Sequence, residues 1–223
     1  MKTLNHFLLG ALLVLFVTAC KNDTKAPQLD VEQEDTNKAM SKDIPFFENK
    51  QAFFGETHVH TSSSMDAFIG GNRMTPEDAY RFAQGEEMMV NGSAHKLKRP
   101  LDFAAVSDHA EYLGETYTLM NAGTPGYDDP VATQMREADN YEDAMKLFVK
   151  YVITPARTGG SSHPDFYQGE TSTMSVWRKN FDATEKYYEP GKFTTLHAFE
   201  WTSAPNAGNL HRNVIFRDTI LPK

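Results

Sequence analysis

The chain has 223 residues, of which 40% are hydrophobic and 12% aromatic, enough for one globular domain with a buried core. Its formal charge of −8 at pH 7 argues against nucleic acid as a partner, because phosphate backbones attract basic surfaces. The single cysteine excludes an internal disulfide and a cysteine-rich zinc site.

Residues 1–20 have the layout of an export signal. Lys2 supplies positive charge, and the apolar run at residues 7–16 is shorter than the roughly 20 residues that a membrane-spanning helix needs. The segment ends in Val17-Thr18-Ala19-Cys20, which resembles the lipobox of bacterial lipoproteins. The resemblance implies that Cys20 is lipidated and anchors the protein outside the cytoplasm, on the periplasmic or cell-surface side of a membrane. The alternatives are an ordinary secretory signal and a short buried helix.

Residues 21–43 are polar and have no steady hydrophobic period, which favours a flexible tether. A marginal surface helix over residues 31–40 is the alternative. Residues 44–223 are then expected to form the folded domain, whose ordered packing begins at the apolar residues around Phe46.

The first candidate site follows a predicted strand at residues 52–60. His58 and His60 project from one face of this strand, because alternate side chains of a strand share a face. Asp66 follows in a predicted loop at residues 61–71. Two imidazoles and a carboxylate suit zinc or a related divalent metal. A buried histidine pair bonded to the backbone is the alternative.

A second strand with the same arrangement is predicted at residues 100–106, whose nearly continuous apolar run is typical of a buried parallel strand. Asp108 and His109 follow it directly. Active sites of α/β folds gather at the carboxyl ends of strands, so the repetition supports a site. Between the two strands, Thr75-Pro76 predicts the start of a helix that ends at Gly85, and Asn91-Gly92 predicts a hairpin turn.

The remainder of the chain extends the α/β pattern. Helices are expected between residues 112 and 160, most clearly at 141–151, and over 172–188, with loops at 123–130 and 158–169. A strand is predicted at residues 192–201, with Glu200 near its end. His211 then precedes a short strand at residues 214–216.

Four segments together carry a family resemblance: FGETHVHTSSSMDA, PLDFAAVSDHAEYLGE, YYEPGKFTTLHAFEWTS and GNLHRNVIFRD. They resemble the PHP (polymerase and histidinol phosphatase) superfamily of metal-dependent phosphoesterases and, more closely, the PHP-related family called domain of unknown function 3604. The resemblance implies a distorted (βα)7-type barrel with two or more divalent ions, zinc, manganese or iron, at its carboxyl-terminal mouth. It implies metal-ligand roles for six residues: His58, His60, Asp66, His109, Glu200 and His211.

Asp108 and Arg212 are the candidate catalytic residues. Asp108 adjoins a ligand and is expected to orient an imidazole. Arg212 and Arg73 each lie close in sequence to a motif and are candidates to hold a substrate anion, but a surface or structural salt bridge is the favoured interpretation of both arginines. The other histidines of the domain are expected outside the site: His95 in a polar hairpin and His163 in a loop, both exposed to solvent, and His197 in the core or a pocket wall.

The chain contains no Asp-x-His motif, with which proteins of the PHP superfamily typically complete their site. Its predicted strands are also too few for a seven-stranded barrel. We therefore expect the chain to be the amino-terminal part of a longer protein or a truncated gene product, inactive alone.

Three functions remain in view: a phosphoesterase, a hydrolase of a non-phosphate ester or an amide, and a non-catalytic surface lipoprotein that binds a partner. The metal chemistry favours the hydrolases, since metal ions about 3.5–4 Å apart activate water without a Ser, Cys or Lys nucleophile. The substrate, a small molecule or an ester, and the oligomeric state are not predicted by the sequence.

Overall fold

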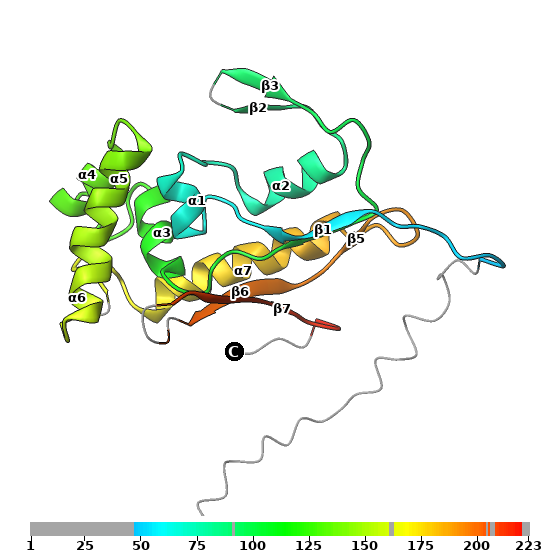
Figure 1. Cartoon of the computed structure of the whole chain (residues 1–223). Helices are drawn as coiled ribbons and strands as arrows, with labels where there is room; N and C mark the ends of the chain where they lie inside the picture. The colour runs from blue at the N-terminus through cyan, green and yellow to red at the C-terminus, as the bar shows by residue number, and fades with distance from the viewer. Residues whose placement is uncertain (1–46, 91, 161–162, 204, 206–207, 220–223) are drawn as a thin grey trace, which may run out of the picture. The chain divides into compact units, whose positions relative to one another are not determined.

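The computed structural model describes residues 47–90, 92–160, 163–203, 205 and 208–219 (Figure 1). They belong to one compact unit, residues 43–223, of mixed α/β structure. The predicted export signal and tether lie outside the described residues. Among the helices of the described part, none has the length and apolar character that crossing a membrane requires.

A small parallel sheet contains both strands that were predicted to precede the site. β1 (Gly55–Val59) pairs with β4 (Phe103–Val106), and β4 pairs with the short β5 (Thr194–Thr195), in the order β1-β4-β5. The two predicted strands are confirmed. Gly55 permits their close approach, because a Cβ there would collide with the backbone and ring of Phe103.

The predicted strand at residues 192–201 is two strands, β5 and β6 (Ala198–Ser203). The chain changes partners between them: Leu196 N donates to Ala104 O at 3.0 Å, whereas His197 O accepts from Phe216 N at 2.9 Å. β6 then lies beside the segment after β4, where Glu200 N donates to Asp108 O and Ala110 N donates to Glu200 O. This attachment places the second half of the predicted strand next to His109.

β7 (Leu210–Ile215) pairs with β6 in antiparallel orientation and begins four residues before the predicted strand at 214–216. The hydrophobic pattern gave no sign of this beginning, because the first residue of β7, Leu210, is followed by three polar residues, His211 to Asn213. The antiparallel return brings His211 opposite Thr202 and Asn213 opposite Glu200. Residues directly opposite one another share a face of the sheet, so all four lie on one face.

Two helices that lie far apart in the sequence, α2 (Pro76–Ala83) and α7 (Glu170–Tyr187), pack against the parallel sheet. α2 begins with a capping box between Thr75 and Asp78, and Gly85 follows it in the left-handed region at φ 90°. α7 lies beside α2, and its Thr184 hydroxyl is 2.9 Å from the fully buried Tyr80 hydroxyl. These helices and the sheet share one core: Tyr80, Ala83, Ala104, Val106, Ala183 and Phe193.

A second core lies among the remaining helices. They are α1 (Met65–Ile69), α3 (Leu113–Met120), α4 (Pro130–Arg136), α5 (Tyr141–Phe148), a π-helical segment (Val149–Ile153) and α6 (Thr154–Arg157). The prediction of a loop throughout residues 61–71 was wrong, because Met65, Phe68 and Ile69 recur at helical spacing and are buried. Pro155 has no backbone N–H to donate toward residue 151, where the regular helix gives way to wider turns.

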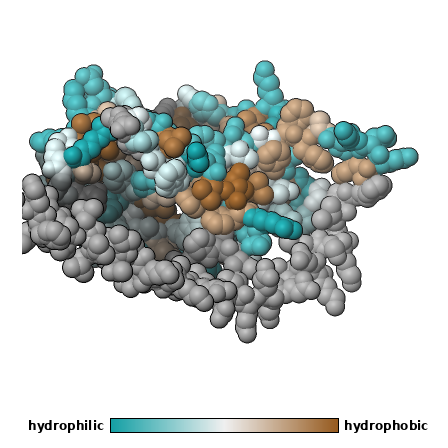
Figure 2. Space-filling model, turned by 60° about the horizontal axis from the view of Figure 1, so that its bottom comes forward, coloured by the Kyte–Doolittle hydropathy of each residue, from teal (hydrophilic) through white to brown (hydrophobic). Residues whose placement is uncertain are grey.

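The described residues confirm an α/β fold but close no barrel. They form the sheet β1-β4-β5, the β6-β7 pair, and a hairpin of β2 (Met88–Val90) and β3 (Ser93–His95) that flanks the predicted turn. Figure 2 brings forward the side on which β7 lies in Figure 1 and shows hydrophobic residues at this surface. Trp201, Leu210 and Ile215 are the large hydrophobic residues of β6 and β7 that are exposed.

Candidate metal centre

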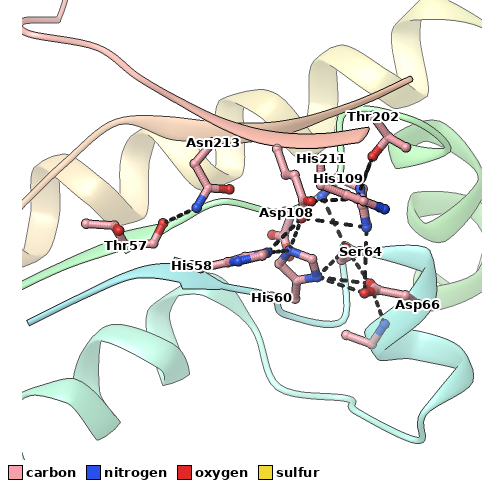
Figure 3. Close-up of polar contacts among 12 residues, drawn as sticks. Thr57, His58, His60, Ser64, Asp66, Asp108, His109, Thr202, His211 and Asn213 are labelled. Carbon is pink, nitrogen blue, oxygen red and sulfur yellow. Dashed lines mark hydrogen bonds and ion pairs between the residues drawn. The ribbon is translucent and has the colours of Figure 1, made fainter. Parts of the chain in front are cut away.

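The six residues predicted as metal ligands converge on one side of the sheet (Figure 3). His58 and His60 come from the end of β1, Asp66 from α1, and His109 from the segment after β4. Glu200 comes from β6 and His211 from β7. They form three overlapping groups whose ligand atoms lie within 4.8 Å of one another: His58, His60 and Glu200; His60, Asp66 and His109; and His109, Glu200 and His211.

Glu200 lies at the centre of this constellation, with a side chain that is 2% exposed. Its Oε2 is 2.9 Å from His58 Nε2 and 2.6 Å from His60 Nε2, and its Oε1 is 2.7 Å from His211 Nδ1. The Nε2 atoms of His58 and His60 are themselves 3.1 Å apart. One buried carboxylate thus faces imidazoles that lie far from it in the sequence.

Asp66 forms a second, more exposed side of the site. Its Oδ2 is 2.9 Å from His60 Nδ1 and 3.7 Å from His109 Nε2. Ser64 Oγ donates to Asp66 Oδ1 at 2.7 Å and accepts from the His109 backbone N–H at 3.1 Å. Ser64 was not predicted, and nothing distinguishes it in sequence from the serines before it.

Thr202 joins the two histidines on the other side of the site. Its hydroxyl oxygen is 3.0 Å from His109 Nδ1 and 3.1 Å from His211 Nδ1. Its backbone N–H donates to Glu111 Oε1 at 3.0 Å, and Glu111 Oε2 lies 3.6 Å from His109 Nδ1. Thr202 was also missed, although strand alternation places it two residues after Glu200 on the same face.

The strand that bears His58 is irregular next to it. The β1–β4 register shifts between Glu56 and Val59, and Glu56 Oε1 accepts hydrogen bonds from the backbone N–H groups of Thr57 and His58, both at 2.9 Å. Asn213 Nδ2 donates to Thr57 O at 2.9 Å (Figure 3). Bulges of this kind redirect a side chain beside a functional site. Glu56 and Asn213 therefore fix the direction of His58.

Of the two candidate catalytic residues, Asp108 lies beside the site and Arg212 does not. Asp108 is buried and accepts hydrogen bonds from Thr61 N and from Thr61 Oγ1, the latter at 2.7 Å, so it ties the residue after His60 to the residue before His109. Burial raises the pKa of Asp108 to about 6, against the opposing effect of the Thr61 hydrogen bonds. Arg212 alternates with His211 and Asn213 along β7 and therefore lies on the opposite face.

The remaining candidates have structural partners. Arg73 lies 3.8 Å over the Phe68 ring and donates to Phe68 O at 2.6 Å. His197 is stacked on Phe181 and pairs with Glu185 at 2.7 Å, which agrees with the predicted core position. His163 pairs with Glu115 and is stacked on Tyr167, and His95 is an exposed residue of β3.

The ionisable groups of the site stabilise one another in their charged forms. Burial alone would raise the pKa of Glu200, but the His58 hydrogen bond and the nearby imidazoles lower it below its usual value. Burial likewise opposes the lowered pKa of Asp66, which follows from hydrogen bonds with His60 and Ser64. The pKa of His60 is raised, because the Asp66 hydrogen bond and the surrounding carboxylates outweigh its burial.

The donor set fits divalent transition metals. Imidazole nitrogens and carboxylate oxygens are the ligands that zinc, manganese and iron share. Asp66, Asp108, Glu111 and Glu200 form no salt bridge with Lys or Arg in the part of the chain that the structure describes. Imidazoles are the basic partners of Glu200 and Asp66, and these groups are free to bind a cation when the imidazoles are neutral. The cluster could therefore hold a metal ion.

Of three comparisons with known proteins, one identifies a family. The family model described as "Protein of unknown function (DUF3604)" matches residues 47–223. A search of curated proteins and a search of solved structures each found no match. The family match covers the whole of the site and most of the chain, so the chain belongs to the DUF3604 family.

Proposed function

We propose that this protein is a metal-dependent hydrolase of phosphoesters, related to the PHP superfamily, whose active site is the cluster around Glu200. The observation that carries the proposal is the convergence of six histidine and carboxylate side chains from five separate segments into overlapping ligand groups. A single group of three such residues is common in proteins without a metal. Three overlapping groups, two of which share a carboxylate that is only 2% exposed, are not expected by chance.

The two groups that contain Glu200 would each hold one ion. His58 and His60 would bind a first ion with Glu200, and His109 and His211 would bind a second ion with Glu200, which would bridge the two. Asp66 would bind a third ion with His60 and His109, or complete the shell of either of the others. When bound, divalent ions supply Lewis acidity toward a phosphoryl oxygen and lower the pKa of water to near neutrality.

The chain's own residues would hold this site in place. The Thr202 hydroxyl and the Ser64 hydroxyl orient the imidazoles of His109 and His60, as hydrogen-bond partners of metal ligands do. Asp108 holds together the two segments from which three of the ligands come. Because bound metal ions would activate water, no Ser, Cys or Lys nucleophile is required.

Hydrolysis assays test this proposal. The sequence predicted a chain that is inactive alone, but the converged ligand groups lead us to propose that it is active. The full chain, loaded with Zn²⁺ or Mn²⁺, should hydrolyse at least one member of a panel of phosphomono- and phosphodiesters, and excess chelator should abolish the activity. The panel also includes sulfate esters, carboxylate esters and amides. Turnover of an amide or a sulfate ester without any phosphoester would reject the assignment of phosphoesters.

We also propose that the protein works outside the cytoplasm, attached to a bacterial membrane by lipid on Cys20. The support is the sequence of residues 1–20, with its short apolar run and the lipobox-like ending.

A further inference from the structure

A cavity of about 470 Å³ adjoins the candidate metal centre. Three of the six proposed ligands line it, Asp66, His109 and His211, together with Glu111 and Thr202. The other side comes from the end of α5, the π-helical segment and α6: Phe148, Ile153, Ala156 and Arg157. Pockets of about 300–1,000 Å³ are typical of sites for small molecules, so the volume suits a compact organic substrate.

A larger cavity, of about 560 Å³, lies under the β2–β3 hairpin, but it suits a charged substrate less well. Of the six proposed ligands it touches His60 alone, and its other lining residues include the core side chains Tyr80, Ala104 and Val106. Neither Lys nor Arg is among its described lining residues. A substrate that reacts at the cluster would have to contact several ligands, as the cavity beside α6 allows.

Arg157 is the one Lys or Arg among the described residues that line the cavity beside α6. Its side chain forms no ion pair with Asp66 or Glu111, although both line the same cavity, and no other salt bridge in the described part of the chain involves it. A guanidinium at the wall of a cavity is therefore available to a ligand. Its planar fork suits a carboxylate or phosphate.

The backbone around this cavity is unusual at two places. Tyr112 is the one non-glycine residue with positive φ, 68°, among those described, and its ring contacts the Phe148 ring edge-on at 5.7 Å. The π-helical segment (Val149–Ile153) connects Phe148 to the turn that carries Arg157. Left-handed residues and π-turns cluster at ligand sites, where they aim particular side chains. Both features here border the cavity.

We propose that the cavity binds a small phosphoester that carries a second anionic group, and that Arg157 pairs with this second group. The inference rests on the proposed function, which places the scissile phosphate at the ligands. The middle of the substrate would contact the apolar side chains of Phe148 and Ile153. Because Arg157 is not paired with the carboxylates of the site, its positive charge is left for the distal end of the substrate.

Two stable probes separate the roles of the two ends: phenylphosphonate, and 4-carboxyphenylphosphonate, which adds one distal carboxylate. Their dissociation constants are measured by calorimetry on the metal-loaded full chain in detergent. Wild-type protein should bind the carboxylate-bearing probe about tenfold more tightly. Arg157→Gln should abolish this preference and leave phenylphosphonate binding within about twofold, and Arg157→Lys should restore part of it. Arg178→Gln, which removes an exposed Arg of α7 paired with Asp182, is the matched control.

If Arg157→Gln weakens the binding of both probes equally, Arg157 lies at the phosphoryl group and the inference is overturned. An unchanged preference for the carboxylate-bearing probe in Arg157→Gln would also overturn it. Binding of neither probe by metal-loaded wild-type protein would also overturn it. Metal content and phenyl phosphate hydrolysis are measured on the same samples. Wild-type protein that holds metal and hydrolyses phenyl phosphate, but binds both probes equally, would contradict the inference alone. Wild-type protein that holds no metal and hydrolyses no phenyl phosphate would contradict the proposed function.

Discussion

Two buried carboxylates of this protein have very different surroundings. Glu200 faces three imidazoles at 2.6–2.9 Å, and its pKa is lowered despite burial. Glu115 of α3 is 1% exposed, has His163 as the partner of one oxygen, and leaves Oε2 buried without a hydrogen bond. A buried carboxylate with an unsatisfied oxygen destabilises its ionised form. Glu200 therefore suits a metal site, whereas Glu115 is a cost to stability at neutral pH.

The sequence supported the prediction of ligands but not that of their supporting residues. His58, His60, Glu200 and His211 were recognisable because imidazole and carboxylate groups at strand ends are few. Ser64 and Thr202 were missed because a hydroxyl carries no such signal until its neighbours are known. The prediction for Arg212 relied on closeness in sequence, which cannot tell the two faces of a strand apart.

Substitution of Glu115 tests the surroundings of this carboxylate. Burial raises the pKa of Glu115 more than the His163 hydrogen bond lowers it. The unfolded chain therefore ionises first as pH rises, and the folded state loses stability between the unfolded pKa and the higher folded pKa. Glu115→Gln should match wild type at pH 4 and be more stable at pH 7, by on the order of 1 kcal/mol.

Urea unfolding of metal-free protein at the two pH values measures this difference. Glu142→Gln, on the exposed side of α5, is the control and should show no comparable pH dependence. The opposite result would be a Glu115→Gln variant that loses more stability relative to wild type at pH 7 than at pH 4. It would mean that the ionised Glu115–His163 pair stabilises the fold.

At the scale of elements, β1 combines a regular beginning with an irregular end. Its register with β4 is kept at Gly55 and Glu56 and shifts before Val59. The Glu56 carboxylate satisfies the two backbone N–H groups that the shift leaves without strand partners. The element that presents His58 thus depends on a side chain two residues earlier.

Replacement of Glu56 tests this dependence. Glu56→Ala should weaken metal binding by about 10–100-fold, because His58 would lose its fixed direction. Glu56→Gln should stay close to wild type, since an amide oxygen can accept the same two hydrogen bonds. Competition with a chromophoric chelator gives the metal affinities. Equal losses in both variants would point to the charge of Glu56 rather than to its hydrogen bonds.

Long or strongly patterned elements were predictable, and short or polar ones were not. The capping residues of α2 and the apolar run of β4 determined both elements locally. α1 has only five residues, so the spacing of its three buried side chains was not enough to predict a helix. In β7, His211 and Asn213 face the site instead of a core. The break between β5 and β6 depends on which neighbours supply hydrogen bonds, which the sequence does not state.

At the scale of the whole molecule, the site is assembled from segments that are up to about 150 residues apart, as the pair His58 and His211 illustrates. Parallel strands end at one edge of a sheet, so the convergence of the residues after β1 and β4 could be anticipated. Strand direction does not account for His211, because β7 returns in the antiparallel direction, and His211 was predicted from the family resemblance instead. The expected barrel is likewise not closed by the described residues, where β7 pairs with β6 alone.

Anchoring is a property of the whole chain and is tested in bacterial cells that process lipoproteins. Wild-type protein should sediment with membranes and be released by detergent but not by high salt, as expected for acyl chains in a bilayer. Cys20→Ser should appear in the soluble extracytoplasmic fraction or remain unprocessed at its full length. Cys20→Ser protein that is processed and still membrane-bound would contradict lipidation at Cys20.

The metal content of the purified full chain tests the central claim most directly. After loading with Zn²⁺ or Mn²⁺ and removal of excess ions, elemental analysis should find two or more ions per chain in the wild type. Glu200→Gln, which removes the carboxylate shared by two ligand groups, should retain at most one. Glu189→Gln, at an exposed salt bridge with Lys192, is the matched control and should bind as wild type does. A folded wild-type chain that holds no metal after loading would contradict the account.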